Sequence, residues 1–185
     1  MSSSKRPSQT TMEGMLWNAN HVLDSALDPK SGASSGKGGI PKDLIKKCYG
    51  VVLISVVEAG FIFSGSVGTG VLMAHYPKWD TWSAPSAVSL TGIGFGFFVG
   101  KGARDMVILI MDPTLKEVSG MGEIRFGHEM DTDSKGGHSS TDLLRGSHSF
   151  VFSKGFFVGT SLDTSVLVAR NKENERFYGK KATPK

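Results

Sequence analysis

The stretch YGVVLISVVEAGFIFSGSVGTGVLMAHY, residues 49–76, decides the fold class of this chain. Valine, isoleucine and phenylalanine dominate it, and glycine interrupts the apolar runs at Gly60, Gly65, Gly68 and Gly70. Apolar, β-branched runs that glycine breaks are typical of bent or bulged strands. A transmembrane helix does not fit, because Glu58 and the repeated glycines cut the apolar run. The stretch therefore predicts strands.

The same pattern returns downstream. Residues 86–100 repeat it, residues 104–112 and 121–130 resemble further strands, and residues 149–171 resemble two or three more. Helical patterns do not alternate with these strands, so a parallel doubly wound sheet is not expected. The sequence predicts a mainly β fold of the α+β class over residues 40–179. A curved antiparallel sheet, a sandwich or a barrel all fit the pattern.

Two helices are expected ahead of the strands. After a flexible lead at residues 1–9, apolar residues recur at helical spacing over residues 10–27, which predicts an amphipathic helix. A Gly/Ser linker at residues 28–39 leads to a short basic helix at residues 40–48. We expect both helices to cover one face or one end of the β domain. Residues 180–185 form a basic tail.

The composition limits the compartment and the class of partner. The chain has 185 residues, which fits one domain, and a net charge of +4. Cys48 is the only cysteine, so an internal disulfide and a Cys-rich zinc site are excluded. The polar start, MSSSKRPSQTT, shows no secretory signal, and a cytoplasmic location is expected. The positive charge permits an anionic partner, but no nucleic-acid-binding motif is present and no nucleic acid is expected.

The motifs of common enzymes are missing. The glycine-rich run TGIGFGFFVG, residues 91–100, continues as a strand, whereas a dinucleotide site needs a glycine turn that opens into a helix. No P-loop, G-x-S-x-G or H-E-x-x-H motif occurs, and the five histidines are scattered. We expect neither an enzyme nor a cofactor.

One polar loop has part of a calcium-binding pattern. Asp131, Asp133, Gly136 and Asp142 fall at positions 1, 3, 6 and 12 of an EF-hand loop. Lys135 takes position 5, where an oxygen ligand is needed, and the flanking helices are missing from the pattern. A solvated hairpin loop fits this segment better, so the three aspartates are a weak calcium candidate and no metal is expected.

Four lysines form the main charged cluster, all within eleven residues: Lys37, Lys42, Lys46 and Lys47. Each lysine near an anionic leaflet contributes about 1 kcal/mol, so the cluster suits a negatively charged surface. The helix at residues 10–27 has two interpretations. Its apolar residues either insert into a membrane interface or brace the sheet; the residues concerned are Met15, Leu16, Trp17 and Leu23.

The segment KWDTWSAPSA, residues 78–87, places two tryptophans three residues apart. We expect Trp79 and Trp82 to bracket a hairpin turn and to pack over its end, with Pro85 fixing the entry into the next strand. An exposed tryptophan that stacks on a ligand is the alternative interpretation.

Several motifs together resemble the SYLF domain family. They are residues 40–76, then WSAPSAVSLTGIGFGFFVG at 82–100, FSKGFFVGTSL at 152–162 and FYG at 177–179. The resemblance implies a non-enzymatic module that binds phosphoinositides, actin filaments or both, where membranes are remodelled or endocytosed. It also implies that the N-terminal amphipathic helix contacts the membrane.

The chain departs from the family pattern at three positions. Tyr49 and Glu58 stand where the family has lysine, and Ser66 stands where it has arginine. These departures remove three cations that the family resemblance places in one neighbourhood. The closing helical segment of the family is also expected to be missing after FYG. The lysines at residues 40–48 therefore stay as the candidates for phosphate contact.

Three hypotheses follow for the function. The first is a peripheral, cytoplasmic module that binds phosphoinositides or other anionic membranes in membrane remodelling or endocytosis. The second is an actin-filament-binding cytoskeletal protein, and the third is a β-barrel carrier of an apolar ligand. Sequence alone does not choose the lipid headgroup, the main partner or the oligomeric state.

Overall fold

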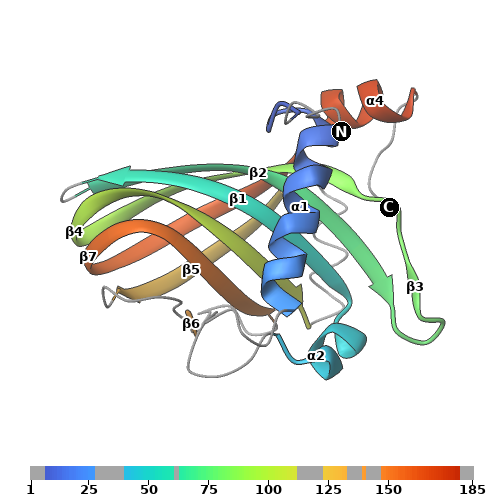
Figure 1. Ribbon diagram of the computed structural model, residues 1–185, viewed down its shortest axis with the longest axis horizontal. Helices are drawn as coiled ribbons and strands as arrows, with labels where there is room; N and C mark the ends of the chain where they lie inside the picture. The colour runs from blue at the N-terminus through green and yellow to red at the C-terminus, as the bar shows by residue number, and fades with distance from the viewer. Residues whose placement is uncertain are drawn as a thin grey trace, which may run out of the picture.

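Seven antiparallel strands dominate the computed structural model, which describes residues 7–27, 40–60, 63–111, 123–132, 139–140 and 147–179 (Figure 1). The strands follow the order β3-β2-β1-β4-β7-β5, and β6 pairs with β7. The strands are β1 (Gly50–Gly60), β2 (Phe63–Tyr76), β3 (Thr81–Trp82), β4 (Ser86–Ile110), β5 (Glu123–Thr132), β6 (Ser139–Ser140) and β7 (Ser147–Ala169). The helices are α1 (Met12–Leu27), α2 (Lys42–Lys47) and α4 (Asn171–Tyr178). The predicted mainly β fold with a curved antiparallel sheet is confirmed.

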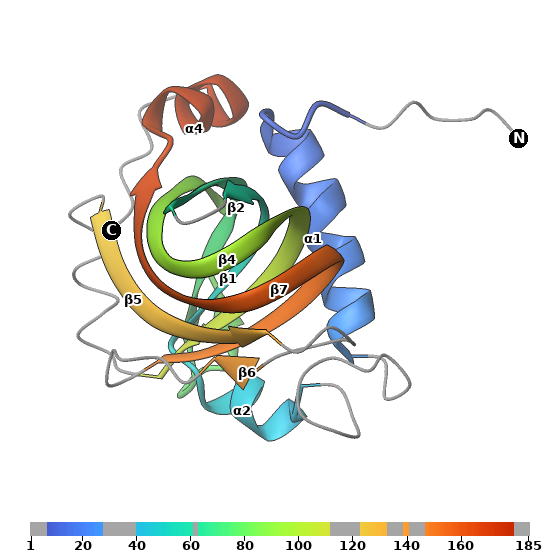
Figure 2. The same cartoon turned by 90° about the vertical axis from the view of Figure 1, so that its left-hand side faces the viewer.

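Two very long strands curl the sheet into a roll. The first part of β4, residues 86–95, pairs with β2, and its last part, residues 100–110, pairs with β1. Since β1 and β2 also pair with each other, β4 must turn back on itself between these two parts. β7 follows β4 from end to end and wraps around it, as Figure 2 shows.

The predicted strand boundaries were wrong in β4 and β7. The segments 86–100 and 104–112 were expected as separate strands, and residues 149–171 as two or three, yet β4 and β7 each run without a break. The pairing of β4 with β7 continues through Gly96, Gly100 and Gly102. Glycine bends the strands there while the ladder stays intact, because it accepts strong curvature at no steric cost.

The two faces of the rolled sheet bury separate sets of side chains, because successive strand residues point to opposite faces. The inner cluster lies inside the roll: Val52, Ile54, Val56, Val88, Leu90, Met106, Ile108, Ile110 and Leu167. The outer cluster joins the other face to the helices: Met12, Met15, Ala19, Val22, Ala26, Ile40, Cys48, Val51, Leu53, Val71, Ala87, Val107 and Leu109. Both faces of β1 are therefore buried over much of its length.

Helix α1 lies across the outer face of the sheet and contacts β1, β2 and β4 (Figure 1). Thr11 caps the start of the helix. The Thr11 carbonyl oxygen accepts a hydrogen bond from the Met15 N–H at 2.9 Å, and its Oγ1 lies 3.4 Å from the Gly14 nitrogen. The helix is docked on the sheet.

A C-terminal helix that the sequence patterns did not predict closes the described chain. Residues 171–178 form α4, which ends at Gly179 with a left-handed φ of 68°. Glycine is the usual residue at this position, because it adopts positive φ at no steric cost. The expected lack of a helical segment after FYG concerns residues outside the described ones. Figures 1 and 2 place α4 beside the N-terminal end of α1.

Candidate functional site

Helix α2 packs on the domain through its apolar side and exposes its lysines on the other side. Leu44 and Ile45 pack against the outer cluster, and Cys48, which follows the helix, is fully buried. The other side of the helix carries Lys42, Lys46 and Lys47, all exposed, together with the exposed Asp43. The apolar residues fix the helix, so the three cations share one exposed surface. Lys37 lies outside the described residues.

The single thiol belongs to this anchor. The Cys48 Sγ donates to the Ile45 carbonyl oxygen at 3.1 Å. Burial raises the pKa of the Cys48 thiol, so the group stays protonated at neutral pH and contributes packing rather than nucleophilic chemistry.

The four apolar residues of α1 that the sequence singled out have different surroundings. Met15 is fully buried against the sheet, and Leu16 and Leu23 are half-buried. Trp17 is 38% exposed, and its ring lies 4.1 Å from that of His21. The apolar face of the docked helix is therefore occupied by the sheet.

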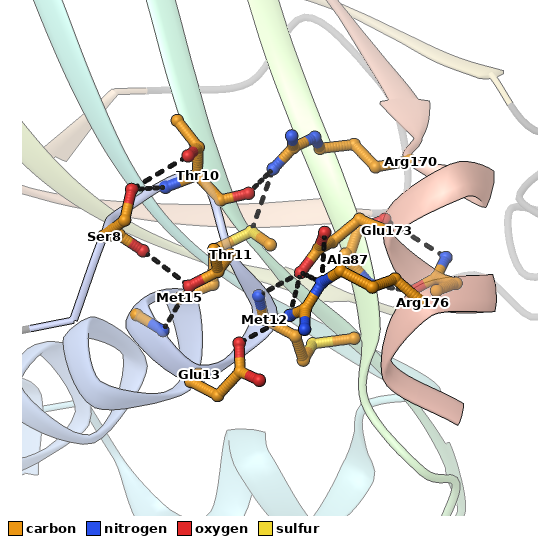
Figure 3. Close-up of polar contacts among 12 residues, drawn as sticks. Ser8, Thr10, Thr11, Met12, Glu13, Met15, Ala87, Arg170, Glu173 and Arg176 are labelled. Atoms are coloured by element: carbon orange, nitrogen blue, oxygen red, sulfur yellow. Dashed lines mark hydrogen bonds and ion pairs between the residues drawn. The ribbon is translucent and has the colours of Figure 1, made fainter. Parts of the chain in front are cut away.

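Polar contacts join α4 and the residue before it to the N-terminal end of α1, and we call this set of contacts the clasp (Figure 3). The Met12 N–H donates to Glu173 Oε1 at 2.6 Å, so a carboxylate caps the positive end of the α1 dipole. Arg176 Nη2 lies 2.6 Å from both Glu13 Oε2 and Glu173 Oε1. Arg170 Nη1 donates to the Thr10 carbonyl oxygen at 2.6 Å. These contacts hold the two ends of the described chain together.

The hairpin between β2 and β3 lies next to α2. The His75 ring is buried, its Nδ1–H donates to the Cys48 carbonyl oxygen at 2.7 Å, and it stacks on Trp82 at 4.1 Å. Trp82 thus packs over the end of the hairpin as predicted. Trp79 does not, because it is 69% exposed. Sequence reasoning missed His75, since no motif marks a histidine that bridges a strand and a distant helix end.

The structure describes only one of the three aspartates of the candidate calcium loop. Asp131 lies in β5, so a strand and not a helix precedes the proposed calcium loop, whereas Asp133 and Asp142 lie outside the described residues. Within the part of the chain that the structure describes, no group of three or more His, Cys, Asp or Glu residues is placed to hold a metal. Among the same residues, no helix has both the length and the apolar character to cross a bilayer.

Comparison with known proteins decides the family. The family model Ysc84, described as "Las17-binding protein actin regulator", matches residues 91–185. The chain belongs to the Ysc84 family. This family contains the SYLF domain, so the resemblance drawn from the sequence motifs is confirmed.

Relatives of this Ysc84-family chain occur in fungi and animals. LAS seventeen-binding protein 3 of Saccharomyces cerevisiae is 36% identical over 155 residues, which cover 79% of this chain and 34% of the relative. SH3 domain-containing protein PJ696.02 of Schizosaccharomyces pombe is 30% identical over 181 residues, covering 93% and 42%. SH3 domain-containing YSC84-like protein 1 of Homo sapiens is 32% identical over 146 residues, covering 75% and 42%.

This chain spans less than half the length of these relatives. The family model is described as an actin regulator, and the Saccharomyces cerevisiae relative is named as a binding protein; neither description is that of an enzyme. No solved structure matches the chain.

The family resemblance placed the three departures from the family pattern in one neighbourhood, but the structure separates one of them from the other two. Glu58 lies directly opposite Ser66 in the pairing of β1 with β2. Tyr49 precedes the other end of β1, nine residues away, which is about 30 Å along a strand. Tyr49 therefore belongs to the α2 end of this Ysc84-family domain, and only Glu58 and Ser66 form a pair.

The clasp makes stability depend on pH. Hydrogen bonds from Arg176 lower the pKa of Glu13 and Glu173 below the ordinary value of 4.5. A carboxyl group whose pKa is lower in the folded state than in the unfolded state stabilises the folded protein. This stabilisation is complete at pH values above the ordinary pKa, and it is lost as the pH falls through the pKa of the folded state. The Tm difference between wild type and Arg176→Met should therefore be largest near neutral pH and shrink below about pH 4. Lys172→Met is the control, and equal pH dependence in both variants would contradict this prediction.

Proposed function

We propose that this chain is a non-enzymatic module that binds phosphoinositides and other anionic membranes as a peripheral protein of the cytoplasm, in membrane remodelling or endocytosis. The observation that supports it most directly is the anchored α2, whose three lysines point away from the core. A fixed cluster of ammonium groups attracts anionic headgroups without the cost of ordering a loop.

The number of lysines that reach the membrane at one time sets the expected strength of binding through α2. Lys42 and Lys46 are four residues apart and share one side of the helix, and Lys47 lies beside Lys46. At about 1 kcal/mol for each lysine near the leaflet, two lysines in contact at a time contribute about 2 kcal/mol. Neighbouring Asp43 opposes part of this attraction. Additional contacts must therefore complete the binding energy.

We assign α1 a bracing role in this proposal. Insertion of its apolar face would require undocking, which exposes buried residues of the outer cluster: Met12, Met15, Ala19, Val22 and Ala26. Undocking would also break the contacts between Arg176 and Glu13 and between Met12 and Glu173. A docked α1 keeps the sheet covered and α2 in place.

Vesicle flotation tests the assignment. Binding should rise with phosphoinositide content and fall with salt, because the attraction is electrostatic. Replacing Lys42, Lys46 and Lys47 together by glutamine should weaken binding roughly thirtyfold, which corresponds to about 2 kcal/mol. Lys172→Gln, an exposed lysine on α4, is the matched control, because α4 lies at the opposite end of α1 from α2 (Figure 1). Unchanged binding by the triple variant would reject the site.

Actin filaments are the second candidate partner, because the family model is described as an actin regulator. The basic surface of α2 also suits an acidic filament. Co-sedimentation with filaments in the absence of lipid separates the two partners, and the same triple variant shows whether α2 serves both. No observation in the described residues favours the apolar-ligand carrier, since side chains of the inner cluster occupy the inside of the roll.

A further inference from the structure

The tip of the β2–β3 hairpin carries an aromatic side chain that the fold does not use. Trp79 is 69% exposed, whereas Trp82 at the base of the same hairpin stacks on His75. Exposed single apolar residues are common, but an indole at a turn next to a basic helix has the chemistry of a contact residue.

The backbone around Trp79 is held in place. The Trp79 N–H donates to the Tyr76 carbonyl oxygen at 3.0 Å, and Thr81 Oγ1 donates to the Trp79 carbonyl oxygen at 3.0 Å. Asp80 adopts a positive φ of 48°, uncommon for a residue with a side chain, and its carboxylate lies 3.4 Å from the His75 Nε2. A strained turn that neighbouring groups maintain is a common feature of functional sites.

Trp79 lies between a positively charged and a negatively charged residue in the chain, Lys78 and Asp80. The Lys78 Nζ lies 5.5 Å from the centroid of the Trp79 ring, within the range of a cation–π contact, and the Tyr76 ring lies 6.3 Å from it. Asp80, the next residue in the chain, carries the opposite charge, and its side chain is exposed. The tip thus offers an amphipathic ring beside an ammonium group.

The hairpin and α2 share one end of the domain. The His75 N–H donates to the Tyr49 carbonyl oxygen at 2.8 Å, and the His75 ring contacts the Cys48 carbonyl oxygen at 2.7 Å. Cys48 directly follows Lys46 and Lys47 of α2. Figure 1 shows α2 and the β3 hairpin at the same end, away from the bend of β4.

We propose that Trp79 and Lys78 form an interfacial anchor, in which the indole enters the headgroup region of an anionic bilayer while Lys78 and the α2 lysines contact its phosphates. Tryptophan suits this depth because its ring is apolar and its N–H finds a polar partner. The anchor rests on the proposed function and supplies the apolar contact that the lysines lack. A bilayer fits better than a filament, because one protruding ring needs no complementary pocket in a bilayer.

Fluorescence of the full chain on vesicles tests the anchor. The background variant Trp17→Phe removes the other exposed indole and leaves Trp79 and the partly buried Trp82. Vesicles of phosphatidylcholine with a phosphoinositide, carrying brominated acyl chains, should quench its emission on binding. Trp79→Ala should abolish the quenching and weaken binding about tenfold, and Trp79→Phe should keep most of the affinity. An unchanged Tm confirms that each variant is folded.

The outcomes separate the anchor from the proposed function. Ile93→Ser is the control, because Ile93 is 75% exposed but lies opposite Gly65 near the start of β2, far from the hairpin. Equal losses in Ile93→Ser and Trp79→Ala overturn the anchor. Lysine-dependent binding without quenching and with full affinity in Trp79→Ala overturns the anchor and leaves the proposed function standing. If wild type binds no vesicles, both fail, and if Trp79→Ala impairs only filament binding, the bilayer is the wrong partner.

Discussion

Replacing Gly70 by alanine should lower the free energy of unfolding by about 3 kcal/mol, the upper range for overpacking a core. A Cβ at this position would lie 2.1 Å from the Leu53 carbonyl oxygen and 2.6 Å from the Ile54 Cα. Both atoms belong to the backbone of β1, so no side-chain rotation relieves the clash. β1 and β2 would have to separate where Ile54 joins the inner cluster.

Gly65→Ala is the matched control for this prediction. Gly65 lies in the same strand, neither glycine adopts a left-handed backbone, and a Cβ at Gly65 would meet no atom within 4 Å. Its effect should stay within about 0.5 kcal/mol, since alanine fits the strand and restricts the unfolded chain. Urea denaturation of both variants gives the comparison. Equal losses of stability would show that the close approach of β1 and β2 is not what requires glycine.

Replacing Asn174 by alanine should cost about 2–3 kcal/mol of stability. The Asn174 side chain is buried, its Oδ1 accepts from the Ala87 N–H at 2.7 Å, and its Nδ2 donates to Ser86 Oγ at 3.0 Å. Alanine would leave the buried N–H of Ala87 without this acceptor, which costs more than the hydrogen bond itself contributes. The variant also removes a buried attachment of α4 to the start of β4.

Asn171→Ala, an exposed amide on the same helix, controls for helix propensity. Its thermal midpoint should stay close to that of wild type, whereas Asn174→Ala should lose both stability and the protection of the α4 amides from hydrogen exchange. Full protection of α4 in Asn174→Ala would contradict the attachment.

Sequence patterns predicted the elements whose signals are local. The apolar, β-branched runs indicated strands in β1 and β2, and the helical spacing of Met12, Met15, Ala19 and Val22 indicated α1. The same reasoning found the lysines of α2, because a short basic helix after proline is visible in ten residues. In these elements the buried side chains recur at the regular spacing of a strand or a helix, so a short stretch of sequence is enough to identify them.

Elements that depend on distant partners were missed. The segment NKENERFY carries no apolar stripe, and α4 is held instead by Asn174, by Glu173 and by the Tyr178 hydroxyl, which donates to the Pro85 carbonyl oxygen. Glycines that looked like strand ends in β4 and β7 became bends, because the neighbouring strand continued the ladder past them. In the hairpin, both tryptophans looked alike, and only the contact with His75 distinguishes Trp82 from Trp79.

The sequence by itself determined that this chain forms a glycine-bent β sheet with an amphipathic helix and a basic helix before it. Hydrophobic periodicity carries that information, since burial repeats every two residues in a strand and every 3.6 in a helix. The tertiary structure alone decided the roll, the clasp and the exposed Trp79. These features arise from pairs such as Met12 with Glu173, separated by 161 residues, and Ala87 with Asn174, separated by 87. Contacts over such separations form only when the sheet has curled, and so they leave no local trace in the sequence.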